Sequence, residues 1–97
     1  MTKQEKFMEV THDIKKQKFY MVVDGLESHL EYARMSSVLN LNHTYVPNEL
    51  RGKGIAGKIV KAALTYAEEN NLKIIPSCSY VADYIQRHKE YEFLVAN

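Results

Sequence analysis

The sequence predicts a mixed α/β fold (α+β, with one mixed sheet). Antiparallel strands in the N-terminal half are followed by a strand, a glycine-rich loop, a helix, a parallel strand and a second helix. Three observations support this prediction. Strand-forming segments flank the turn pair Asp24-Gly25, a glycine-rich run occupies residues 52–57, and apolar residues recur at helical spacing over residues 55–67.

The strands of the first half are marked by turn residues and by alternating patterns. Residues 10–14 are a candidate first strand, and residues 18–23 and 28–35 flank Asp24-Gly25, which favours a tight antiparallel hairpin. Residues 38–46 alternate and are expected to pair with this hairpin. The expected faces of that strand are Leu39, Leu41, His43 and Tyr45 on one side and Asn40, Asn42, Thr44 and Val46 on the other.

The second half begins with a predicted helix. Its apolar face consists of Ile55, Ile59, Val60, Ala63, Leu64 and Ala67. Asn70-Asn71 supplies a left-handed stop. The short apolar segment 72–75 follows a helix and is therefore expected to run parallel to strand 38–46. A second helix is predicted over residues 80–89, and a packed tail over 91–95.

Length and composition predict a single cytoplasmic domain over residues 1–97, and we expect a monomer. The hydrophobic content of 45% supports one modest core, and the net charge of +1 gives no reason to expect nucleic acid as a partner. The longest apolar run, 19–23, is too short to cross a membrane, and residues 1–6 lead into no signal-peptide core. The single cysteine fits a reducing compartment, and the four histidines show no metal-ligand spacing with it, so no metal is predicted.

The most informative segment is the junction at residues 46–57. An apolar strand ends at Val46, and a glycine-rich loop then opens a helix. Such a junction directs unpaired backbone N–H groups and the positive end of the helix dipole to one point, where a phosphate or pyrophosphate can bind. Arg51 and Lys53 add positive charge.

Two familiar phosphate-binding patterns match this segment incompletely. Residues 52–57 spell the dinucleotide fingerprint, but five residues separate them from the strand end and no acidic residue ends the next strand. Residues 52–58 spell most of a P-loop, but Ile59 stands where a magnesium-binding Ser or Thr is required. Both matches are interpreted as coincidences of a short glycine-rich run.

A third pattern fits without a gap. Val46, four residues, and then Arg51-x-x-Gly54-x-Ala56 resemble the acetyl-CoA pyrophosphate loop of the GNAT acetyltransferase superfamily. The likeness extends over residues 38–94 and is greatest to short single-domain GNAT-like N-acetyltransferases that carry a Cys after the strand following the loop. It implies a GNAT-like fold, acetyl-CoA or coenzyme A as cofactor, and transfer of an acetyl group to an amine of a small molecule or peptide.

The resemblance also implies a set of cofactor-binding residues. The strands ending near residues 46 and 75 would splay apart, and the pantetheine arm would lie between them. The expected contacts are Tyr45, Val46, Arg51, Gly52, Lys53, Gly54, Ile55, Ala56, Gly57 and Lys58. Backbone groups would bind the arm and the pyrophosphate, and the lysines would reach the 3′-phosphate.

Two side chains are candidates for catalysis. Cys78 lies three residues beyond Ile75, next to an expected helix N-terminus that would lower its pKa and favour an acetyl-accepting thiolate. The alternative is a small buried hydrophobic residue. His43 could deprotonate an attacking amine or Cys78, and the alternative is a core histidine.

Three functions remain open from the sequence. The first is the acetyl-CoA-dependent N-acetyltransferase. The second is a non-catalytic CoA- or acyl-CoA-binding module, favoured because the further acceptor-side strands usual in the family do not follow here. The third is a protein-interaction domain with a vestigial loop. No membrane partner is expected.

Overall fold

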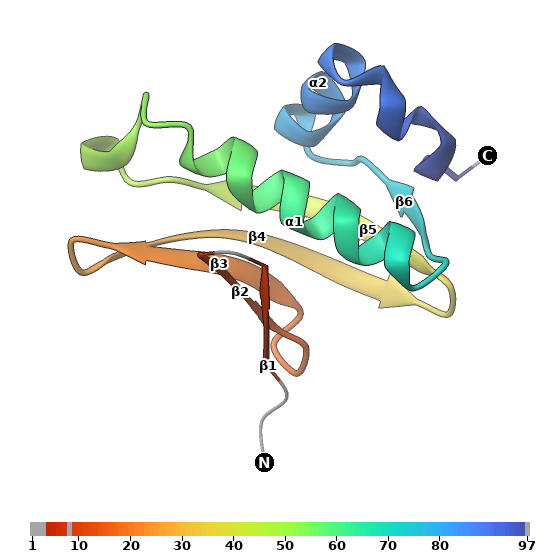
Figure 1. Cartoon of the computed structure of the whole chain (residues 1–97), viewed down its shortest axis with the longest axis horizontal. Coiled ribbons are helices and arrows are strands. Elements are labelled where there is room, and N and C mark those ends of the chain that lie inside the picture. The colour runs from red at the N-terminus through yellow and green to blue at the C-terminus, as the bar shows by residue number, and fades with distance from the viewer. Residues whose placement is uncertain (1–3, 8, 97) are drawn as a thin grey trace.

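A computed structural model of the chain describes residues 4–7 and 9–96. Within these residues six strands form one sheet in the order β1-β2-β3-β4-β5-β6, with β1 to β5 antiparallel and β6 parallel to β5 (Figure 1). The strands are β1 (Gln4–Phe7), β2 (Val10–Asp13), β3 (Lys18–Val23), β4 (Leu26–Met35), β5 (Val38–Tyr45) and β6 (Lys73–Ile75). The helices are α1 (Ile55–Glu69), α2 (Ser79–Arg87) and the 3-10 segments η1 (Asn48–Leu50) and η2 (Lys89–Leu94).

The predicted mixed sheet and its order of elements are confirmed. The β3–β4 hairpin turns at Asp24 and Gly25, whose φ angles of 52° and 77° are the left-handed pair that a two-residue hairpin requires. Strand β1 had no counterpart in the sequence prediction. The expected tail forms the 3-10 helix η2, and the residues after β5 contain η1.

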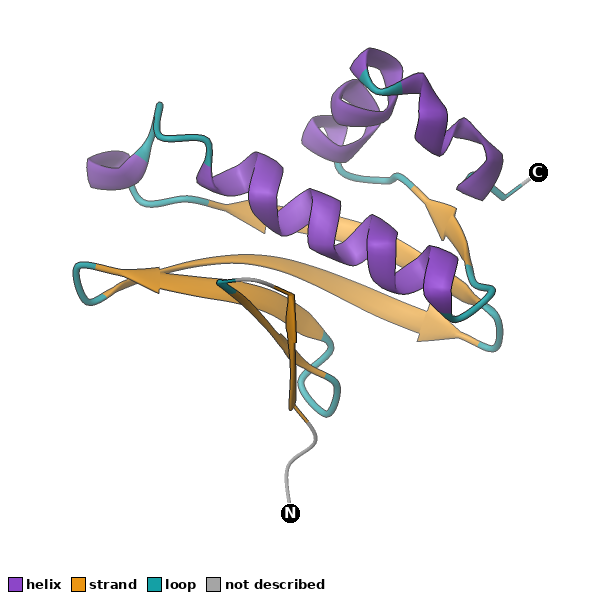
Figure 2. Cartoon of the chain, in the orientation of Figure 1, coloured by secondary structure: helices purple, strands orange, loops and turns teal. Residues whose placement is uncertain are grey.

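The hydrophobic core lies between the sheet and α1, which runs along one face of it (Figure 2). The sheet contributes Phe19, Leu30, Leu39 and Leu41, all fully buried, and α1 contributes Ile59, Val60, Ala63 and Leu64, also fully buried. Burial of each of the larger side chains among these, all except Ala63, stabilises the fold by about 1.5–3 kcal/mol. Val81 and Ile85 of α2 extend this core past the end of β6.

A β-bulge in β5 corrects one prediction. Glu31 pairs with His43 but Tyr32 pairs with Leu41, so Asn42 is an extra residue on β5. One extra residue inverts the alternation of the strand beyond it. The expectation that His43 and Tyr45 share a side with Leu39 and Leu41 is therefore wrong. Both side chains are exposed, which excludes the alternative that His43 is a core histidine.

The same bulge turns Thr44 toward the helix side of the sheet. Thr44 lies directly opposite Leu30, which is fully buried in the core. Cross-strand partners point to the same face. Thr44 is consequently the β5 side chain that is presented to the segment following β6.

Candidate functional site

The edge of β5 that faces β6 opens after Asn40. Parallel pairing joins Val38–Asn40 to Lys73–Ile75, and one further hydrogen bond runs from the Cys78 N–H to the Leu41 carbonyl, 3.0 Å. Beyond that point, no described residue pairs with residues 42–45 along this edge. The two strands thus separate toward their C-terminal ends, which is where open α/β sheets bind ligands.

The glycine-rich loop brings a helix N-terminus to the same end of β5. Gly54 is the N-cap of α1 with a φ of 76°, and Gly52 has a φ of 81°. These left-handed conformations favour glycine, and an added Cβ at either position would meet no atom within 4 Å. The helix has no side-chain cap and no acidic residue in its first turn. Its first N–H groups are therefore directed at open space and suit an anion.

A cleft with a volume of ≈ 430 Å³ joins the loop to the end of β5. Seven of the predicted cofactor-binding residues line it: Tyr45, Val46, Arg51, Gly52, Gly54, Ile55 and Ala56. Lys53, Gly57 and Lys58 do not line it. Thr44, Leu50 and Tyr80 complete the lining, and Leu50 carried no signal in the sequence because a leucine in a turn is uninformative.

The basic side chains of the loop are already engaged in part. Arg51 donates from Nε to the Val46 carbonyl at 3.2 Å and so ties the loop to the end of β5. Lys58 Nζ lies 3.5 Å from a carboxylate oxygen of Glu9, in an exposed ion pair that contributes little to stability. Arg51 therefore lines the cleft as a charged side chain that also braces the loop against the end of β5.

Cys78 is the N-cap of α2, and its thiol contacts Thr44. The Thr44 Oγ1 and Cys78 Sγ atoms are 3.3 Å apart. Partial burial alone would raise the pKa of Cys78, but the Thr44 hydroxyl and the backbone N–H groups of Val81 and Tyr80 outweigh it and lower the pKa. A thiol with a lowered pKa has more of the nucleophilic thiolate at neutral pH.

The other catalytic candidate lies on the far side of the sheet. His43 precedes Thr44 in β5, and successive side chains of a strand point to opposite faces. Its ring faces that of His29, with 5.9 Å between centroids. The structure therefore brings Cys78 into contact with Thr44, which lines the cleft, and places His43 on the opposite face.

Comparison with known proteins identifies the class to which this fold and cleft belong. The sequence profile of the GCN5-related N-acetyl-transferase family matches residues 18–94. The chain therefore belongs to this family of acetyltransferases.

Individual relatives agree with that assignment. The chain is 32% identical to the chicken (Gallus gallus) protein NATD1 over 90 residues, covering 90% of this chain and 82% of that one. It is also 32% identical to human NATD1, covering 88% and 78% of the two chains. A GCN5-like protein of Staphylococcus aureus, solved by NMR, superposes with a TM-score of 0.68 at 29% identity, covering 99% of this chain and 89% of that one. Among the described residues, no helix has the length and apolar character to cross a membrane.

Proposed function

We propose that residues 1–97 form one acetyl-CoA-dependent N-acetyltransferase domain. One observation carries the proposal: a single cleft connects the uncapped N-terminus of α1 to the end of β5, whose edge is unpaired, beside the thiol of Cys78. A phosphate group at one end and a thioester at the other are the features of acetyl-CoA that this arrangement suits. The residues present thus fit this acetyl donor, which is a substrate of the reaction.

At the phosphate end, the backbone N–H groups of Ile55, Ala56 and Gly57 would hold the pyrophosphate. No described residue accepts a hydrogen bond from them. The bulge and the short β6 leave backbone groups of residues 42–45 to pair with the amides of the pantetheine arm. Lys53 would add charge near the 3′-phosphate. Lys58 would do so after leaving Glu9.

At the thioester end, Cys78 would act as the nucleophile. Its thiolate would attack the thioester carbonyl carbon, forming a new carbon–sulfur bond while the coenzyme A thiolate leaves. An amine would then attack the acetyl-Cys78 carbonyl, forming an amide and returning the Cys78 thiolate. The amine loses one proton in this step, and solvent water would accept it, because His43 lies on the opposite face of the sheet from Cys78.

A second candidate function is a non-catalytic CoA-binding module. The position of His43 favours it, because His43 and Cys78 lie on opposite faces of the sheet and Cys78 contacts Thr44 instead. Both functions need the same cleft, so they differ only in whether an acetyl group is transferred.

The cofactor assignment predicts selective thermal stabilisation. A ligand that binds only the folded protein, present at 100 times its Kd, stabilises it by about 2.7 kcal/mol, which for a domain of this size is roughly 10 °C or more in Tm. Acetyl-CoA is expected to give this shift in differential scanning fluorimetry, whereas NADH and ATP–Mg give much less. Equal shifts from all three ligands, or none from acetyl-CoA, would contradict the proposal.

A further inference from the structure

The sheet face opposite α1 carries a cluster of ionisable side chains. His29 and Glu31 are two residues apart on β4 and therefore point to the same face, and Glu31 pairs directly with His43 of β5. One ligand atom from each of the three side chains lies within 4.8 Å of the other two. The bulge at Asn42 creates this cluster, because it turns His43 out of the core and onto this face.

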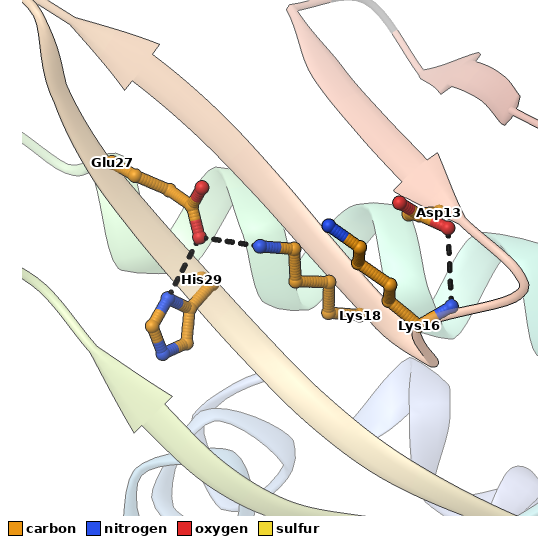
Figure 3. Close-up of polar contacts among 5 residues, drawn as sticks. All are labelled: Asp13, Lys16, Lys18, Glu27 and His29. Atoms are coloured by element: carbon orange, nitrogen blue, oxygen red, sulfur yellow. Dashed lines mark hydrogen bonds and ion pairs between the residues drawn. The ribbon is translucent and has the colours of Figure 1, made fainter.

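A further carboxylate fixes the orientation of one member. Glu27 Oε2 lies 3.0 Å from His29 Nδ1 and 2.8 Å from Lys18 Nζ. Figure 3 shows both contacts as dashed lines. The same Glu27 oxygen accepts a hydrogen bond from Lys18, so it acts as an acceptor toward His29 as well, and Nδ1 of His29 is assigned the hydrogen. Nε2 of a neutral His29 then keeps its lone pair.

We propose that His29, Glu31 and His43 form a zinc-binding site. Two imidazole nitrogens and one carboxylate oxygen are a donor set that zinc takes in four-coordinate sites that keep a water position open. The Glu27–His29 hydrogen bond is the outer carboxylate–histidine contact that orients such ligands. Oxygen-preferring magnesium and calcium suit this set poorly.

Zinc binding would require only small movements of these ligand side chains. Ligand atoms around tetrahedral zinc are separated by about 3.4 Å, given bonds of about 2.0–2.1 Å. Glu31 and His43 are exposed, so their side chains can rotate to bring the ligand atoms, now within 4.8 Å of one another, to this distance. His29 is held in place by Glu27. Spacing along the sequence indicated no metal site because the three ligands come from two strands and meet only through the register of the sheet.

This inference is independent of the proposed transferase function. The cluster lies across the sheet from Cys78 and the cleft, and zinc can be tested without acetyl-CoA.

The test is zinc titration of tag-free protein by calorimetry, in the Cys78→Ser background so that the thiol cannot contribute. We expect one zinc per chain, with His29→Ala and His43→Ala each weakening binding at least tenfold. Glu27→Gln keeps the shape of the side chain but removes its charge, and should weaken binding roughly tenfold or more. His88→Ala is the matched control, because His88 packs on Tyr84 at the end of α2, away from the cluster.

Several outcomes would overturn the proposal. These are the absence of zinc binding, loss of affinity in His88→Ala equal to that in His43→Ala, or full affinity in a His29→Ala, His43→Ala double variant. Equal affinity for magnesium would also contradict it. If either alanine variant fails to fold by circular dichroism, Glu27→Gln and Glu31→Gln, which preserve side-chain size, decide the result.

Discussion

Substitution of Gly54 by aspartate is expected to abolish the thermal stabilisation by acetyl-CoA while leaving the protein folded. Gly54 is the N-cap of α1 and lies next to the first N–H groups of the helix. Aspartate tolerates the left-handed conformation that Gly54 adopts better than most residues do. The new carboxylate would block the close approach of pyrophosphate to these backbone donors and repel its negative charge.

A matched control separates this effect from backbone strain. Gly25 has a φ of 77°, has no atom within 4 Å of an added Cβ, and does not line the cleft. Gly25→Asp should therefore lower Tm without changing the shift caused by acetyl-CoA. An undiminished shift in Gly54→Asp would show that the α1 N-terminus does not bind the ligand.

Arg51→Ala should weaken acetyl-CoA binding only modestly, since the Arg51 side chain braces Val46 and the backbone donors remain.

Cys78→Ser is expected to abolish covalent acetylation of the protein. Wild-type protein incubated with acetyl-CoA and no amine should gain one acetyl group, which hydroxylamine removes because it is a thioester. A serine hydroxyl at Cys78 is similar in size but is a poor nucleophile near neutral pH, so the variant should keep the acetyl-CoA-induced Tm shift and lose the adduct. Intact-protein mass spectrometry measures the adduct, and an unchanged adduct in Cys78→Ser would place the acetyl group elsewhere.

The contact between Thr44 and Cys78 predicts how this loading depends on pH. Removing a hydroxyl that stabilises the thiolate raises the pKa of Cys78, so Thr44→Val should slow loading near neutral pH and approach the wild-type rate at higher pH. Thr65→Val on α1, outside the cleft, should leave the profile unchanged. Coincident profiles for Thr44→Val and wild type would show that Thr44 does not tune the thiol.

The fold was predictable where local sequence decides it. Asp24-Gly25 favours one type of hairpin turn, and the apolar spacing of α1 indicates its buried face, so both elements follow from neighbouring residues. The bulge at Asn42 was not predictable in this way. The position of the bulge depends on how β5 pairs with β4. A prediction that assumes simple alternation along β5 ignores the bulge and assigns His43 to the wrong face.

The same distinction holds for the candidate site: features made of neighbouring residues were predictable, and contacts between distant segments were not. The loop residues are consecutive, so most of the cleft lining falls within one sequence motif. The helix N-terminus at Cys78 was also predictable, because a short strand and a helix flank it. The Thr44–Cys78 contact and the His29–Glu31–His43 cluster join distant segments, and they appear only when the register of the sheet is known.

Mass spectrometry of candidate amines incubated with the protein and acetyl-CoA tests the central proposal most directly. The panel should contain small amines, peptide N-termini and peptide lysines. The transferase account predicts at least one acetylated amine that forms in proportion to protein concentration and does not form with Gly54→Asp. Stabilisation by acetyl-CoA without any acetylated amine or acetyl-Cys78 would contradict catalysis and indicate a CoA-binding module.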